Sequence, residues 1–203
     1  GETVGRPYSI VSAPGDPFLE FYLSTVPEGP LSPRLAALKA GDAVQVAPKP
    51  NGFLVLDEVP PAIHLWLVST GTGLGPFLSI LKTPEPWQRF QRVVLVHAVR
   101  TADELAYRRT IARIAEVEPK RFAYIPFLSR EAADYALAGR IPQAIGDGRL
   151  EARAGLALDA TLAHVMLCGN PAMVEDVTAA LAARGFRKHK RKEPGQISME
   201  TYW

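Results

Sequence analysis

The stretch HLWLVSTGTGLGPFLSILKT, residues 64–83, contains the clearest indication of fold in the chain. Its first seven residues form a continuous apolar run, which is typical of a strand buried on both faces of a parallel sheet. A glycine-rich turn follows and opens a helix. Ligands of parallel sheets bind at such strand–helix turns, where glycines let a phosphate approach the helix N-terminus. The stretch therefore predicts an α/β domain with a ligand site at this turn.

Strands and helices continue to alternate after this stretch. The predicted strands are VVLVHAV (93–99), FAYIPFLS (122–129), HVMLCG (164–169) and a short last one in ISMETYW (197–203). The predicted helical segments are ADELAYRRTIARIAEV (102–117), GRIPQAIGDGRLEARAG (139–155) and NPAMVEDVTAALAARG (170–185). Alternation of this kind predicts βαβ units, and hence a doubly wound, five-stranded parallel sheet with helices on both faces.

The residues before this domain have a different pattern. Short β-rich runs are bounded by Pro, Gly and Asp in YSIVSAP (8–14), LEFYLSTV (19–26), DAVQVAPKP (42–50) and GFLVLDEV (52–59). One short helix is predicted in SPRLAALKAGD (32–42), with Ser32 as its N-cap and Pro33 at its first position. This pattern favours an antiparallel barrel or sandwich. We therefore predict two domains, residues 1–61 and 62–203.

Composition excludes several classes of function. The single cysteine, Cys168, allows neither an intrachain disulfide nor a CxxC metal or iron–sulfur framework, and it fits a reducing compartment such as the cytoplasm. A net charge of +2 is too small to argue for nucleic-acid binding on its own. No apolar run approaches the roughly 20 residues that a membrane span needs. We expect no metal site, no nucleic-acid partner and no membrane association.

Two turns at strand ends are candidate ligand sites. STGTGLGP (69–76) is close to the dinucleotide fingerprint G-x-G-x-x-G without matching it, and a tight turn without a ligand is the alternative. CGNP (168–171) repeats the arrangement at the end of a later strand. There Cys168 can also be a small buried residue, and Asn170 a helix N-cap.

Charged and aromatic residues supply further candidates. In RPYS (6–9), strand alternation puts Arg6 and Tyr8 on one face. Arg100, Arg130 and Arg140 follow predicted strands and can clamp a phosphate, although a solvated surface position explains any one of them. FRKHKRK (186–192) contains five cations. Three interpretations are open: a docking face, a nucleic-acid patch or a solvated loop.

Taken together and in this order, the motifs resemble those of the ferredoxin/flavodoxin–NADP⁺ reductase family, in particular its bacterial flavodoxin-type members. The resemblance covers essentially the whole chain. RPYS matches the flavin motif R-x-Y-S, GPLSPRL (29–35) the diphosphate-binding turn and helix, and GTGLGP the NADP motif, in which alanine is more usual than Gly75. CGNPAM (168–173) matches the nicotinamide-side motif, and Glu200 and Tyr202 match a C-terminal E-x-Y to which Trp203 is added.

The resemblance implies an FAD enzyme. Hydride would move between nicotinamide C4 and flavin N5, and single electrons would pass to or from a ferredoxin or flavodoxin. The catalytic residues it implies are Ser9, near N5, and Cys168 and Glu200, beside the nicotinamide. Tyr8 and Tyr202 would cover the two faces of the flavin, and Trp203 its adenine. It also implies a six-stranded FAD barrel, of which this chain, with only GETVG before RPYS, would lack the first strands.

The remaining implied residues fall into two sets. The FAD-binding set is Arg6, Pro7, Tyr8, Ser9, Leu23, Ser24, Thr25, Leu31, Ser32, Thr72, Tyr202 and Trp203. The NADP-binding set is Gly71, Thr72, Gly73, Arg100, Ser129, Arg130, Arg140, Cys168, Gly169 and Asn170.

An acidic protein partner would dock near the basic stretch, on a chain that we expect to be a monomer. The cations concerned are Arg187, Lys188, Lys190, Arg191 and Lys192. Two alternatives are the reductase component of an oxygenase and a non-catalytic basic binding module. Many oxygenase reductases carry a cysteine-ligated [2Fe–2S] domain, which one cysteine cannot hold, and a binding module leaves the flavin and dinucleotide motifs unexplained.

Overall fold

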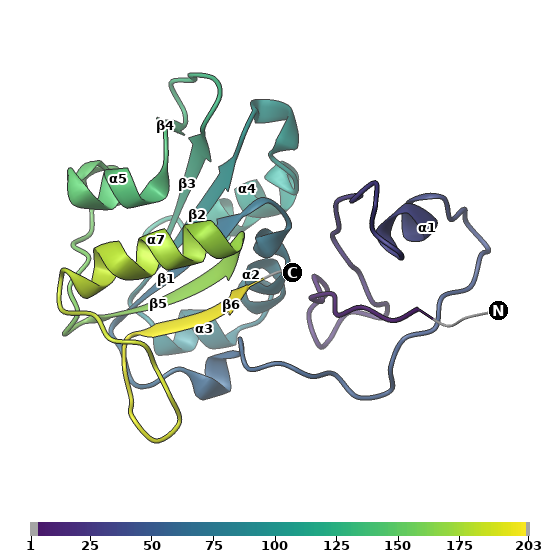
Figure 1. The fold of residues 1–203 in the computed structure, drawn as a ribbon. Helices are drawn as coiled ribbons and strands as arrows, with labels where there is room; N and C mark the ends of the chain where they lie inside the picture. Colours follow the sequence, from purple (N-terminus) through teal and green to yellow (C-terminus); the bar gives the residue numbers. More distant parts are fainter. Residues whose placement is uncertain (1–3, 202–203) are drawn as a thin grey trace.

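The computed structural model describes residues 4–201, and in it a six-stranded parallel sheet forms the centre of the domain that begins at residue 64 (Figure 1). The strands are β1 (His64–Thr70), β2 (Arg92–Val99), β3 (Phe122–Leu128), β4 (Leu137–Ala138), β5 (Ala163–Gly169) and β6 (Ile197–Thr201). Their order across the sheet is β4-β3-β2-β1-β5-β6, and every neighbouring pair is parallel. The predicted parallel α/β domain is confirmed, but it has six strands rather than five. The additional strand, β4, has only two residues, too few to give a recognisable pattern.

Helices cover both faces of the sheet (Figure 1). One face carries α2 (Leu74–Leu81), α3 (Glu85–Arg89) and α4 (Arg108–Val117); the other carries α5 (Ile141–Gly146), α6 (Arg149–Ala154) and α7 (Pro171–Ala182). Alternate residues of β1 serve the two cores: Leu67 belongs to the same buried cluster as Phe77 of α2, and Trp66 to that of Val177 of α7. Because both faces are buried, the central residues of the strand, Leu65–Val68, are all apolar.

The described residues before β1 contain no strand, so the four strand predictions there are not met as made. YSIVSAP and LEFYLSTV meet only at one antiparallel bridge, between Ile10 and Phe21. DAVQVAPKP forms no ladder, and GFLVLDEV contains instead the 3₁₀ turn η1 (Leu56–Glu58). An isolated strand pair is marginal without a third strand or a helix to pack against. Val44 and Val46 alternate as in a strand, but among the described residues they pair with no other strand and are 54% and 50% exposed.

The short helix α1 (Ser32–Ala36) is confirmed, but Ser32 is not its N-cap, and Pro33 is its second residue rather than its first. The capping position is occupied by Leu31, which gives no side-chain cap. The Ser32 hydroxyl instead accepts the N–H of Val26 at 2.9 Å and donates to the carbonyl of the same residue at 3.3 Å. It closes the preceding turn, and it is buried in doing so.

The amino-terminal segment is attached to the sheet domain at both ends. Val11 is fully buried and belongs to the same apolar cluster as α2. Further along, the guanidinium of Arg89 donates to the carbonyls of Leu56 at 2.7 Å and Val59 at 2.9 Å. Among the helices of the described part of the chain, none has the length and apolar character needed to cross a bilayer.

Candidate active site

The site forms where the strand order reverses. From β1 the chain proceeds outward through β2, β3 and β4, and then returns to place β5 and β6 on the other side of β1. Ligands of open α/β sheets bind outside the carboxyl ends of the strands at such a point. The register places Ser69 of β1 next to Cys168 of β5, and Cys168 next to Glu200 of β6. Two predicted catalytic residues, Cys168 and Glu200, are thereby neighbours.

The two glycine turns pack backbone against backbone. A Cβ atom on Gly73, in the 3₁₀ turn η2 (Gly71–Gly73), would overlap the carbonyl oxygen of Cys168. Gly169 has φ +136°, and a Cβ atom there would overlap the Thr70 hydroxyl. That hydroxyl accepts the N–H of Asn170 at 2.9 Å. The turns after β1 and β5 thus form one unit, which only glycine permits at positions 73 and 169.

A buried histidine forms a hydrogen bond to the turn after β1. His97 of β2 is fully buried, and its Nε2–H donates to the carbonyl of Gly71 at 3.0 Å. Burial lowers the pKa of His97 to about 4, so the ring is neutral at neutral pH. Sequence reasoning missed this residue, although a histidine inside the apolar run VVLVHAV was a usable signal. Gly71 itself has φ +51° and open space where a side chain would lie.

We expect stability to fall as the pH drops from 7 to 5. His97 and His164 are buried and both have a pKa of about 4, below the ordinary value of 6.5. In that interval the unfolded chain binds protons that the folded chain does not, so acid favours unfolding by about 1–2 kcal/mol for each ring. Urea unfolding at pH 7 and pH 5 measures the difference. The His97→Asn variant should have a smaller one, and an equal pH dependence in that variant would contradict the assignment.

The two catalytic candidates on β5 and β6 differ in exposure. Cys168 is fully buried, whereas Glu200 is half-buried, and its burial raises the pKa of its carboxyl group. Asn170 caps α7 as predicted, since its side-chain oxygen accepts the N–H groups of Ala172 at 2.9 Å and Met173 at 3.4 Å. A capping role does not prevent its backbone from facing a ligand.

The three arginines of the NADP set gather at one corner. The N–H of Arg130 bonds to the carbonyl of Arg100 at 3.0 Å, and Gly139, just before Arg140, bonds to Leu128 at the end of β3. All three arginines are exposed. Arg100 forms an ion pair with Glu104 at 2.9 Å, while no side-chain partner of Arg130 or Arg140 is found within residues 4–201. Ser129 lies beside Arg130 at the same strand end.

Residues 6–9 and 23–25 of the FAD-binding set lie on the two stretches that the single bridge of the amino-terminal segment joins. Antiparallel pairing of Ile10 with Phe21 brings the stretch 6–9 beside the stretch 23–25. A Cβ atom on Gly75 of α2 would lie 3.3 Å from Val11 and 4.0 Å from the Ser9 carbonyl, so this arm passes the first turn of α2. An exposed guanidinium (Arg6), exposed hydroxyls (Ser24 and Thr25) and a half-buried ring (Tyr8) suit a diphosphate joined to a planar ring system.

Some residues of the FAD set are placed differently or lie outside the description. Thr72 belongs to η2, between the two glycines of the turn after β1. The Ser32 hydroxyl is engaged by Val26, so a ligand would have to meet its backbone. Tyr202 and Trp203 lie outside the described residues.

The basic stretch lies at the opposite end of the sheet. It precedes β6, and the bridge between Lys188 and Ile197 fixes it at the amino end of that strand. Arg191 pairs with Glu58 at 2.6 Å and lies 4.6 Å from the centre of the Phe53 ring. Lys190 pairs with Glu193 at 3.1 Å. Two of the five cations are therefore engaged within the chain.

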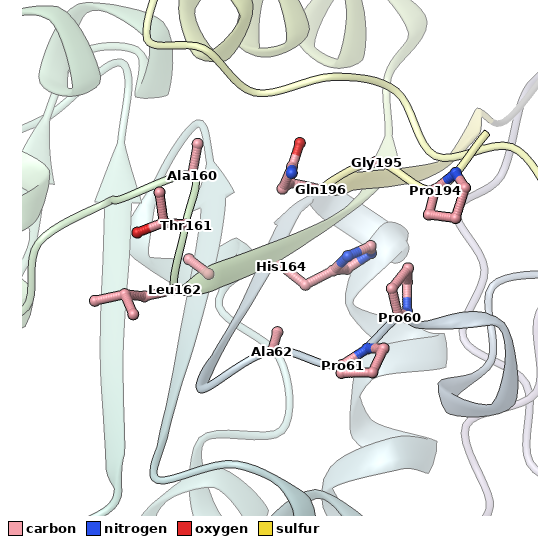
Figure 2. A pocket seen from close by; sticks show the side chains of 11 residues that line it. Pro60, Pro61, Ala62, Ala160, Thr161, Leu162, His164, Pro194, Gly195 and Gln196 are labelled. Carbon is pink, nitrogen blue, oxygen red and sulfur yellow. The ribbon is translucent and has the colours of Figure 1, made fainter.

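A small cavity lies at this same amino edge. Figure 2 shows the His164 ring between the segment of Pro60 and Pro61 and the segment of Pro194 and Gly195. The cavity measures about 120 Å³, below the range of pockets that hold cofactors. No group of three His, Cys, Asp or Glu side chains that could hold a metal ion occurs within residues 4–201.

Comparisons with known proteins agree with this arrangement. Residues 67–179 match the family model of the oxidoreductase NAD-binding domain. The chain is 48% identical to the flavodoxin/ferredoxin–NADP reductase of Escherichia coli K12, over 100% of this chain and 82% of that protein. It is 37% identical to the ferredoxin–NADP reductase of Pseudomonas aeruginosa, over 98% and 80%. A crystal structure of a ferredoxin NADP⁺ reductase from Neisseria gonorrhoeae with bound FAD and NADP superposes with a TM-score of 0.92 at 35% identity, covering 98% of this chain and 80% of that one.

Proposed function

The chain belongs to the flavodoxin/ferredoxin–NADP reductase family, and from this membership we propose that it moves electrons between NADP(H) and a ferredoxin or flavodoxin with FAD as its cofactor. The observation that carries the proposal is 48% identity along the whole chain to a reductase of that name. The juxtaposition of the glycine turn, Cys168 and Glu200 at the strand-order reversal supports it.

The residues of the site would have different roles in binding FAD and NADP(H). FAD, when bound, supplies the hydride and single-electron chemistry, and the protein supplies binding, orientation and electrostatics. Arg6 would neutralise the diphosphate, and Tyr8 would pack on one face of the ring system. The turns at Gly71–Gly73 and Cys168–Asn170 would receive the nicotinamide end of NADP(H), with Glu200 supplying a polar group there.

Three further assignments belong to the same proposal. Ser9 would hydrogen-bond near the reacting edge of the flavin, supported by its place beside the first turn of α2. Tyr202 and Trp203 would cover the flavin and the adenine, as the family resemblance implies. The remaining residues of the two binding sets would line the same two ligands.

Absorbance spectroscopy tests the proposal directly. The purified chain, mixed with FAD and desalted, should keep a yellow protein-bound spectrum, and anaerobic NADPH should bleach it. A protein that stays colourless, or whose bound flavin is not reduced by NADPH, would contradict the function.

The proposal also covers the domain division, the oligomeric state and the cellular location of the chain. We propose that residues 1–61 form part of an FAD-binding barrel domain and residues 62–203 an NADP-binding domain, supported by the change of pattern at β1. We further propose that the chain is monomeric and cytoplasmic. Sedimentation equilibrium tests the first statement, and cell fractionation tests the second.

Charge reversal in the basic stretch tests the partner assignment. We propose that Arg187, Lys188, Lys190, Arg191 and Lys192 attract an acidic acceptor, because opposite charges accelerate encounter and salt weakens the effect. Lys188→Glu with Lys192→Glu should slow electron transfer to ferredoxin and spare reduction of a small neutral dye. These two positions avoid Arg191, whose reversal would also break its pair with Glu58. Equal losses with dye and ferredoxin would mean that the stretch has a structural role.

A further inference from the structure

Glu20 connects the amino-terminal segment to the sheet domain through both of its carboxylate oxygens. Oε1 accepts a hydrogen bond from the Tyr107 hydroxyl at 3.0 Å, and Oε2 lies 3.7 Å from Nζ of Lys82. Lys82 also reaches Asp16 of the same segment at 3.2 Å. The side chain of Lys82 is only 22% exposed, so the contact is partly shielded from solvent.

Tyr107 makes this contact from an unfavourable backbone conformation. It has φ 57° and ψ 22°, and within residues 4–201 it is the one non-glycine residue with a positive φ. Such a conformation persists where surrounding contacts hold it, and it is common at functional positions. Here the ring packs edge-on against Tyr22 with centroids 5.5 Å apart, and the hydroxyl bonds to Glu20. Burial raises the pKa of the Tyr107 hydroxyl, so it remains a donor.

The backbone of Glu20 carries the contact onward to both flavin-set stretches. Its carbonyl accepts the N–H of Val11 at 2.8 Å, and its N–H donates to the Ser12 hydroxyl at 3.1 Å. The stretch 6–9 ends two residues before Val11, and the stretch 23–25 begins three residues after Glu20. The Ser79 hydroxyl of α2 donates to the Ser12 carbonyl at 2.8 Å, so the sheet domain also holds the stretch that contains Ser12.

We propose that Tyr107 and Lys82 are positioning residues which, through Glu20, set the placement of the flavin-binding stretches relative to the nicotinamide turns. The inference rests on the proposed function. Transfer between two bound groups requires the reacting atoms to lie roughly 3–3.5 Å apart, and a misplacement of about 1 Å can cost 100-fold in rate. Loss of this contact should therefore slow the reaction while each ligand still binds.

Hydrogen exchange tests the contact without any ligand. In Tyr107→Phe the ring and the backbone conformation are kept and one hydrogen bond is lost, so the Val11 amide should exchange about fivefold faster. Tyr124→Phe is the matched control, because the buried Tyr124 hydroxyl has no hydrogen-bond partner within the described residues. Its exchange at Val11 should equal that of the unaltered chain. When Glu20→Gln and Tyr107→Phe are combined, the increase in exchange at Val11 should be smaller than the sum of the two single effects, because both substitutions act on the same contact.

Stopped-flow reduction by NADPH tests the positioning role in the flavin-loaded protein. Tyr107→Phe should slow flavin reduction by about 10-fold or more, with the dissociation constants of FAD and NADP⁺ nearly unchanged. If the unaltered chain fails to bind FAD or to accept reduction, the proposed function fails. If it is active and Tyr107→Phe matches it in rate and in exchange, the positioning role is overturned. A loss of FAD affinity as large as the loss of rate would overturn it too, since the residue would then act in binding.

Discussion

Replacing Gly73 by alanine is expected to abolish NADP(H) binding and to lower the free energy of unfolding by about 3 kcal/mol, at the upper end of the overpacking range. The Gly73 backbone, with φ −59°, is acceptable for alanine, so the cost is steric. The added methyl group would overlap the Cys168 carbonyl, and neither backbone segment can yield without separating the turns after β1 and β5. Urea unfolding and NADP⁺ titration measure the two effects.

Gly75→Ala is the matched control, two residues away in the same motif. There the new methyl group would lie 3.3 Å from a Val11 side-chain atom, which can move. Alanine is also favoured over glycine inside a helix by about 1 kcal/mol, so stability should be unchanged or raised. Equal losses in the two variants would show that the contact between the two turns does not decide the outcome.

The Arg130→Ala and Arg140→Ala variants are expected to raise KM for NADPH by about 30-fold each and to leave KM for NADH nearly unchanged. Removing one partner of a charge-assisted bond to phosphate costs about 2 kcal/mol, and only NADPH carries the 2′-phosphate. Neither side chain has a partner within residues 4–201 that would compete for it, in contrast to Arg100, which pairs with Glu104.

Arg113→Ala controls for the change in net charge. Arg113 is an exposed residue of α4 and is not part of the predicted site. Both KM values should stay the same in this variant. If Arg130→Ala weakens NADPH and NADH equally, the arginine corner does not read the 2′-phosphate.

The sheet domain could be predicted from sequence because its signals are local. Leu65–Val68 and Val93–Val96 are buried on both faces, so their apolar runs show directly in the sequence. Asn170 was predictable as a cap because capping depends on the next three residues. The two-residue strand β4 and the short helix α3 leave no comparable periodicity.

The amino-terminal segment was harder to predict because strands depend on distant partners. Val44 and Val46 alternate like a strand, yet in the described residues they remain exposed and unpaired. Ser32 and Pro33 form a typical helix start, but the hydroxyl bonds to Val26, which propensity cannot foresee. His97 and Tyr107 were missed for the same reason, since their roles depend on Gly71 and Glu20.

The position of β1 at the middle of the sheet has a consequence for synthesis on the ribosome. Its partner β2 follows closely, but its other partner, β5, begins only at Ala163, roughly 90 residues after β1 ends. At 5–20 residues per second the ribosome needs about 5–20 s to make that interval. During this time one edge of a highly apolar strand has no native neighbour and is open to wrong pairing. Nascent chains should therefore need protection from aggregation mainly between the emergence of β1 and that of β5.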